Sequence, residues 1–182
     1  MAENKVQFGL KNVHYAVWDG SDYGTPVAIP GAVNLTLEAE GDMQKFYADD
    51  IAYFTTNTNN GYSGDLEVAR FPDQMLQDIW GFTLHSTDKT LTEDANANAV
   101  TFALMYQIAG DQNNNMYVLY ACTATRPGIG SATKQETTEP QTQTCNITAV
   151  PNAAGAVFAK TTADTPTSVR NSWFTSVYTP ST

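Results

Sequence analysis

The stretch VNLTLEAE, residues 33–40, indicates the fold class of this chain. Its residues alternate strictly between apolar side chains (V, L, L, A) and polar ones (N, T, E, E). Successive side chains of a strand point to opposite faces of a sheet, so the pattern predicts a half-buried β-strand. Glu38 and Glu40 stand two residues apart and therefore share its outer face.

Similar strand signals continue on both sides of this stretch. Residues 44–47 and 51–56 follow it, and the turn-rich run 57–61 separates them from a further strand signal at 62–71. We expect these segments to form a meander of antiparallel strands. Later strand segments are a hairpin of residues 99–109 and 116–125 about the polar turn 110–115, and the segments 142–150 and 156–161.

Residues 71–81, FPDQMLQDIWG, interrupt the strand pattern with a helix signal. Pro72 suits the first helical position, Asp73 the positive end of the helix dipole, and Gly81 the stop. The apolar side chains that share one helix face are Met75, Leu76, Ile79 and Trp80. This helix is predicted to cover apolar side chains of the sheet. The spacing of residues 168–178 permits a second helix.

The sum of these segments is about eight strands with one or two short helices, which predicts a mainly β chain. We expect an antiparallel β-sandwich or a partly closed barrel that forms one domain over residues 1–182. Residues 126–140 contain two Gly, two Pro and several Ser and Thr, and so predict a long surface loop. Loops of this length usually carry a function or move.

The chain is acidic, with nine Lys and Arg against nineteen Asp and Glu and a formal charge of −10. This balance disfavours nucleic-acid binding, which depends on basic side chains displacing counterions from phosphates. The N-terminus lacks a secretory signal, and the apolar stretches are too short to span a bilayer. We therefore expect synthesis in a reducing cytoplasm, with Cys122 and Cys145 as free buried thiols.

Catalytic and metal-binding motifs are scarce. The two histidines, His14 and His85, lie in separate strand-like segments, and neither has a Cys or a second His at metal-ligand spacing. The run that starts at Asp111 resembles a calcium loop for five positions, but Met116 then replaces the required glycine and Cys122 the bidentate Glu. We predict no catalytic, cofactor-binding or metal-binding residues, and therefore no enzyme.

Three carboxylate pairs leave one enzymatic alternative open: Glu38 with Glu40, Asp49 with Asp50, and Asp65 with Glu67. Paired carboxylates can cleave glycosides when they flank a substrate cleft at a defined separation. A solvated acidic face is the commoner use of such pairs, and we favour it.

Several segments, in order along nearly the whole chain, resemble the major tail protein (tail tube protein) family of siphophages, mostly those of Gram-positive hosts. These segments are PGAV (30–33) leading into the strand at 37–40, FYADDIAY (46–53), NGYSGDLE (60–67), PD (72–73) with the helix, LY (119–120) with CTA (122–124), RPGIG (126–130), QTQT (141–144) and WF (173–174). The weight of the resemblance comes from their number and order.

The resemblance implies a virion structural protein without enzyme activity or cofactor. Its copies would assemble in the host bacterial cytoplasm into hexameric rings that stack into a non-contractile tube around a tape-measure protein. Tail terminator and tip proteins would bind the ends of the tube, DNA would pass through it as non-specific cargo during ejection, and no membrane would be involved. Some family members carry an added immunoglobulin-like domain, which residues 1–182 lack.

Two sets of site residues follow from these expectations. We expect an acidic lumen, because six copies at −10 each would carry −60 and repel phosphates. Its candidates are Glu38, Glu40, Asp65 and Glu67. Loops and edge strands are the usual surfaces for subunit contacts. The inter-subunit candidates, from the turn at 57–64 and the loop at 126–140, are Asn60, Gly61, Tyr62, Arg126, Gly130 and Lys134.

A second function class remains open at this stage. A carbohydrate- or receptor-binding β-sandwich module of a phage tail or cell surface would present aromatic side chains in exposed loops. Tyr23 and Tyr62 are the loop candidates for such a site.

Overall fold

The computed structural model describes residues 7–110, 113–133 and 140–180. Its strands and helices, in chain order, are β1 (Leu10–Val17), β2 (Val27–Ala28), β3 (Ala32–Glu40), β4 (Met43–Ala48), β5 (Ile51–Asn57), β6 (Gly61–Val68), α1 (Asp73–Trp80), β7 (Thr83–Leu84), β8 (Leu91–Thr92), β9 (Phe102–Ile108), β10 (Met116–Ala124), β11 (Gln143–Ala149), β12 (Phe158–Lys160) and α2 (Thr167–Ser172). The described chain is therefore mainly β with two short helices, as predicted.

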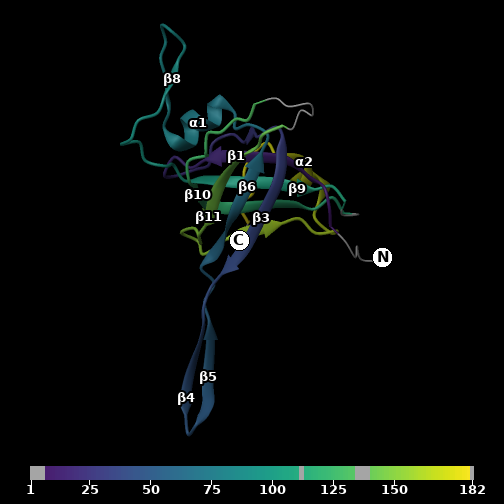
Figure 1. Ribbon diagram of the computed structural model, residues 1–182. Coiled ribbons are helices and arrows are strands. Elements are labelled where there is room, and N and C mark those ends of the chain that lie inside the picture. The colour runs from purple at the N-terminus through teal and green to yellow at the C-terminus, as the bar shows by residue number, and fades with distance from the viewer. Residues whose placement is uncertain (1–6, 111–112, 134–139, 181–182) are drawn as a thin grey trace.

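Eight of the strands form one antiparallel sheet in the order β2-β1-β9-β10-β11-β6-β3, with β12 paired to β10. Strands β1 and β3 are far apart in this order, yet they contact each other, so the sheet curls back on itself. Figure 1 shows β3 and β6 crossing over β1, β9 and β10 as a second layer. This confirms the predicted sandwich or partly closed barrel.

Strand β10 turns the corner between the two layers. Its first half pairs with β9 and β12, and from Cys122 onward it pairs with β11. The register shifts between Leu119 and Cys122, and Ala121 adopts a φ of 42° there. A bulge of this kind bends a strand, which allows it to pass from one layer to the next.

The two layers differ in how many of their faces are buried. The central strands of the first layer have apolar side chains on both faces, so β9 is almost continuously buried over Phe102–Ile108. In the second layer β11 alternates instead, with Cys145 and Ile147 buried and Thr144 and Asn146 exposed. One face of the second layer therefore packs on the core and its other face is solvated.

The main core lies between the layers and is closed at one end by α1. Helix α1 buries Met75, Ile79 and Trp80, and the Trp80 Nε1–H donates to the Ala124 carbonyl at 3.2 Å. The Tyr15 hydroxyl in β1 donates to Asp78 Oδ2 at 2.7 Å, which ties the helix to the first layer. The helix ends at Gly81 in the left-handed conformation, as predicted.

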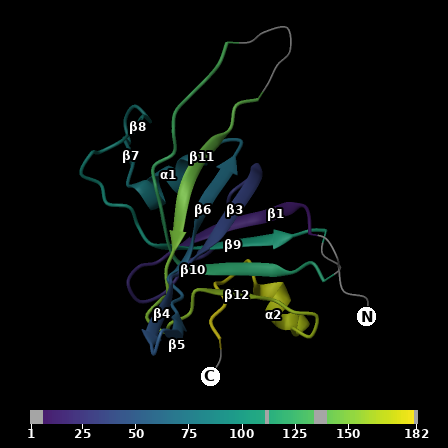
Figure 2. The same cartoon turned by 60° about the horizontal axis from the view of Figure 1, so that its bottom comes forward.

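A second core covers the outer face of β1, β9 and β10. Trp173, at 2% exposure, packs there with Met105 and Tyr120. The Tyr120 hydroxyl donates to the Tyr178 carbonyl at 2.7 Å, and burial raises the pKa of Tyr120 to about 12. The segment after α2 (Thr167–Ser172) is therefore held against the sheet by aromatic packing, and Figure 2 shows α2 beside β12 on this side.

Three local predictions were wrong. The meander is not formed, because β3 pairs directly with β6, while β4 and β5 pair with each other outside the main sheet. Pro72 has a ψ of 140° and precedes the helix, which begins at Asp73. Val33 is 54% exposed because it is the extra residue of a bulge between Ala32 and Asn34.

Candidate assembly surfaces

The outer face of β3 and β6 carries all four acidic residues that the sequence singled out. In the register of this pair Thr36 lies opposite Asp65, Glu38 opposite Ser63, and Glu40 opposite Gly61. Opposed residues share a face, so Glu38, Glu40 and Asp65 project to the same side. Glu67, two residues after Asp65, belongs to the same face. The structure thus brings the four carboxylates together.

Neutral donors hold three of these carboxylates, those of Glu40, Asp65 and Glu67. Thr142 Oγ1 donates to Glu67 Oε1 at 2.6 Å, and the Asn146 Nδ2–H donates to Asp65 Oδ1 at 3.3 Å. The Ser63 hydroxyl donates to the Glu40 carboxylate. Because these three donors carry no charge, the hydrogen bonds orient the acidic groups without cancelling their charge. The face keeps its negative charge and repels polyanions.

Strands β4 and β5 form a two-stranded arm, residues 43–57, that projects from the sheet (Figure 1). Every residue of the two strands is exposed except the half-buried Ala48. Exposed fractions of its large apolar side chains range from 60% to 71%, and these residues are Met43, Phe46, Tyr47, Ile51, Tyr53 and Phe54. An isolated two-stranded hairpin is at best marginally stable in water, and monomers rarely expose such patches without an interaction partner.

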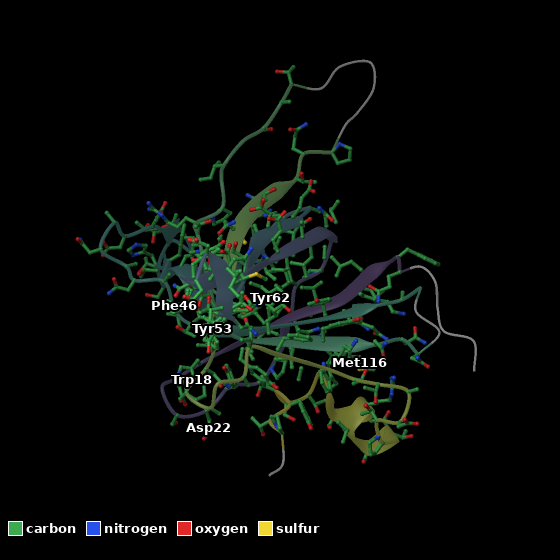
Figure 3. The ribbon with its side chains drawn as sticks, turned by 90° about the horizontal axis from the view of Figure 1, so that it is seen from below. Trp18, Asp22, Phe46, Tyr53, Tyr62 and Met116 are labelled. Atoms are coloured by element: carbon green, nitrogen blue, oxygen red, sulfur yellow. The ribbon has the colours of Figure 1, made fainter. Side chains whose placement is uncertain are left out.

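The arm presents aromatic rings on both of its faces. Phe46 lies opposite Phe54, so these two rings share one face. Tyr47 follows Phe46 along β4 and points to the other face, opposite Ala52. Tyr53 is the extra residue of the bulge between these two pairs. Figure 3, which is seen from below, labels Phe46 and Tyr53.

The arm is anchored by hydrogen bonds at its base. The Asn60 N–H donates to the Glu40 carbonyl at 2.8 Å, and the Asp42 and Thr58 backbones are linked by a bond of 3.1 Å. The tip is a two-residue turn in which Asp49 and Asp50 have φ angles of 52° and 60°. Positive φ at both positions is the geometry of a type I′ hairpin turn. The base therefore continues the β3–β6 ladder, and the tip carries two negative charges.

An apolar groove, defined here by its lining residues, lies at the base of the arm. The residues that line it come from five strands and are Leu37, Tyr62, Tyr106, Tyr117, Leu119 and Phe158. The rings of Tyr106 and Tyr117 stack at 5.0 Å, and Tyr62 meets Phe158 edge to face at 5.7 Å. Burial, with a smaller contribution from Tyr117, raises the pKa of Tyr106 well above its usual value. The wall of the groove is thus largely aromatic, with Tyr106 uncharged at pH 7.

The predicted turn at 57–64 is instead the point where the arm rejoins the sheet. Asn60 is exposed, whereas Gly61 is buried as the first residue of β6. Gly61 has a φ of 108°, and a Cβ there would lie 1.9 Å from the Ala149 carbonyl oxygen, so the fold itself requires glycine. Tyr62 is a strand residue that lines the groove. Their roles in subunit contacts remain predictions.

The loop candidates follow strand β10 in the chain. Arg126 forms an ion pair with Glu93, and Gly130 has open space around its Cα. The neighbouring Ile129 is 93% exposed. Lys134 lies outside the described residues. Thr125, the residue before Arg126, pairs with Asn146, so the start of this loop lies beside the β11 edge of the acidic face.

The residues considered for chemistry have structural partners. His14 Nδ1 lies 2.9 Å from the Asn12 carbonyl oxygen, and His85 Nε2 lies 3.0 Å from Thr92 Oγ1. No group of three or more His, Cys, Asp or Glu side chains suited to a metal ion exists in the described part of the chain. Cys122 and Cys145 are free and buried, as predicted, and burial raises the pKa of each thiol to about 12.

A cavity of about 550 Å³ bears on the receptor-binding alternative. Trp18 and Tyr23 line it, with ring centroids 4.7 Å apart, together with Asp22 and Asn152. Tyr23 lies in a loop, as that alternative requires, whereas Tyr62 lies in β6, so its placement in a loop was wrong. Figure 3 shows Trp18 and Asp22 at the edge of the molecule.

Sequence reasoning missed the arm and the groove. The arm could have been suspected, because FYADDIAYF, residues 46–54, places aromatic side chains in adjacent positions on both sides of a two-residue turn. Such a segment has apolar side chains on both faces, unlike the alternating stretch at 33–40. The groove had no local signal, because its six residues are dispersed between positions 37 and 158.

Comparison with known proteins adds evidence on the fold. No protein-family model and no curated protein sequence matches the chain. A chain in the cryo-EM structure of the anti-feeding prophage (AFP) baseplate, 6-fold symmetrised, matches with a TM-score of 0.50 at 9% identity, covering 90% of this chain and 99% of that one.

Two further solved structures match over similar lengths. The AFP tube terminating cap gives a TM-score of 0.48 at 10% identity, over 88% of this chain and 96% of that chain. The PVC sheath-tube complex of an extracellular contractile injection system, in its extended state, gives 0.47 at 7% identity, over 86% and 93%. The baseplate match shows that this chain shares a fold with a component of a prophage assembly.

Proposed function

We propose that this chain is the structural subunit of a phage tail tube and that its copies associate through the β4–β5 arm. The observation that carries the proposal is the arm itself, whose six large apolar side chains are 60–71% exposed in the single chain. A segment this apolar is stable when a partner covers it. A hairpin anchored to a rigid sheet presents that partner with a surface of fixed orientation.

The shared fold supports this proposal. The AFP baseplate chain covers nearly the whole of this chain and belongs to an assembly that was 6-fold symmetrised. The family resemblance of the sequence points the same way, toward stacked hexameric rings of a non-contractile siphophage tail. In this proposal residues 1–182 act as one tube domain in the virion tail, with no catalytic activity and with the tape-measure, terminator and tip proteins as further partners.

The acidic face of β3 and β6 is proposed to line the lumen of the tube. Glu38, Glu40, Asp65 and Glu67 share this face, and the donors that hold the last three carry no charge. DNA phosphates would then be repelled from the wall and would slide through the tube.

No helix of the described residues is long and apolar enough to span a membrane.

The lumen proposal predicts that E38K/E40K virions assemble tubes but eject DNA more slowly, because the wall would then attract phosphates. Both positions are exposed, so the subunit should still fold. The ejection rate is measured after receptor addition as the rise in signal of a dye that binds the released DNA. E38Q/E40Q, which removes the charge without reversing it, is the control. Wild-type ejection rates for the Lys variant would exclude these residues from the lumen.

The first test of the proposed function is negative-stain electron microscopy of the purified protein at high concentration. Hollow tubes, or rings with a central hole, are the expected result. A glycan array on the monomer tests the second candidate, which the Trp18–Tyr23 cavity favours. A protein that stays monomeric and binds a glycan would overturn the tube proposal.

A further inference from the structure

The apolar groove leaves one end of the main core uncovered. Strand β6 runs from this groove, at Tyr62, to α1, which begins five residues after the strand ends at Val68. Helix α1 covers the core at that far end with Met75 and Ile79. The near end has no such helix among the described residues, and Phe158 at its rim remains 43% exposed.

The size of the groove limits what can fill it. Its volume is about 190 Å³ and its wall is mostly apolar and aromatic. An apolar cavity of roughly 150 Å³ accommodates a benzene ring in other proteins. The groove therefore has room for one phenyl or phenol ring inserted from outside.

The charge beside the groove indicates which ring fits. Lys160 is exposed and lies two residues after Phe158 on β12, so both side chains point to the same face. Tyr117, another groove residue, lies directly opposite Lys160. A segment that places a ring in the groove would therefore be favoured if it also carried an acidic group about 7 Å further along, the length of two strand residues.

The arm of this same chain has that pattern. Phe46 precedes Asp49, the first residue of the acidic tip, by three residues, or about 10 Å along a strand, and Asp50 follows directly. The lysine side chain can span the small difference between these two spacings. The arm projects away from its own sheet, so it cannot enter the groove at its own base (Figure 1).

We propose that the groove binds the arm of a second copy of this chain, with Phe46 of that copy in the groove and its acidic tip against Lys160. This inference rests on the proposed assembly of the chain through its arm, and adds the site that receives the arm. Phe54, opposite Phe46, covers the rim beside Phe158. The bound ring closes the uncovered end of the core, as α1 closes the other end.

An arm and a groove are different surfaces, so this contact is head to tail. Each subunit inserts its arm into one neighbour and receives the arm of another, so the core of each subunit is closed by a ring from a second copy. A head-to-tail contact produces a closed ring if the rotation between subunits closes, and otherwise an open helical filament. A tube can be built from stacked closed rings or from a helical filament around a hollow axis, so either product is compatible with the proposed function.

Cysteine cross-linking tests the contact directly. Two variants, F46C in the arm and F158C in the groove, are prepared separately and mixed, so that a disulfide between these positions can form only between chains. The expected result is a 46–158 linked dimer, identified by mass spectrometry of the linked peptides. The control mixture pairs F46C with S172C, an exposed position at the end of α2. Equal yields in the two mixtures would overturn the proposal.

Charge reversal provides a second test that does not alter the groove. K160E should raise the protein concentration needed for association about tenfold, as loss of a close interfacial charge pair does. K89E makes the same change in net charge on the β7–β8 hairpin and should have little effect. The variant D49K/D50K should weaken association alone and restore it when combined with K160E. Failure of the combination to restore association would contradict the pairing.

The two tests distinguish this inference from the proposed function. If the arm binds another surface, arm variants will still abolish association, while the 46–158 link and the charge rescue will be absent. If the chain does not associate through its arm, arm variants will have no effect. Association is read from sedimentation velocity of the whole protein, which detects paired subunits as well as tubes, and the 46–158 link is read by mass spectrometry.

Discussion

Removal of the Phe46–Phe54 pair should abolish assembly without unfolding the subunit. The two rings are 63% and 60% exposed in the single chain, and they lie opposite each other on one face of the arm. A fully covered aromatic side chain removes about 200 Å² from water, so each ring has about 120 Å² left to bury. At about 25 cal/mol per Å², that area is worth about 3 kcal/mol for each ring.

The expected loss for F46S/F54S follows from this area. Complete burial of both rings in an interface would contribute about 6 kcal/mol, and burial of half of that area about 3 kcal/mol. The smaller figure already raises the concentration required for association about 100-fold. The monomer should keep its melting temperature within about 2 °C, because exposed substitutions change folding stability by about 0.5 kcal/mol or less.

The assay compares sedimentation velocity and light scattering of wild type and variant over a concentration series, with thermal unfolding measured on the same samples. The control, Q44S/T56S, alters the next opposed pair on the same arm face and removes little apolar area. It should assemble like wild type. An F46S/F54S protein that assembles within threefold of the wild-type concentration would refute the reasoning that the arm is an interface.

Two predictions concern the fold itself. G64A should prevent the β3–β6 pairing and yield insoluble protein, because a Cβ at Gly64 would lie 1.8 Å from the Thr36 carbonyl oxygen. The control G128A should stay soluble, because a Cβ at Gly128 meets open space. Equal solubility of the two variants would contradict the argument. The free energy of unfolding should fall as pH rises from 9 toward 12. Burial raises the pKa of Cys122 and Cys145 from 9.0 to about 12. In this pH range the unfolded chain therefore releases protons that the folded chain retains. Urea titrations at successive pH values measure this slope, which C145A should flatten; an unchanged slope in C145A would exclude a contribution of this thiol.

Much of the fold could be predicted from local pattern. The alternation at 33–40 and the apolar strands on either side of residues 110–115 predicted half-buried and buried strands, and these are present as β3, β9 and β10. The helix was predicted by Pro72, its apolar face and Gly81, although it starts one residue later than expected. Strand periodicity and helix ends are properties of neighbouring residues, so a sequence displays them directly.

The candidate site could be predicted only in part. Spacing of two predicted that Glu38 and Glu40 share a face, and the register of β3 against β6 then placed Asp65 and Glu67 on that same face. Which strands pair with each other depends on contacts between residues far apart in the chain. Sequence order alone wrongly suggested that β3 would pair with β4. Only the tertiary structure showed that β6 takes that place and leaves residues 43–57 as an exposed arm.

The sequence by itself determined strands β3, β9 and β10, helix α1 and the acidic charge, because each depends on composition or short-range periodicity. The tertiary structure decided which strands meet, where β10 changes layer at Ala121, and that Leu37, Tyr106 and Phe158 enclose one groove. These features depend on contacts between residues far apart in the chain. The energy of such contacts comes from burial in three dimensions, which no local pattern records.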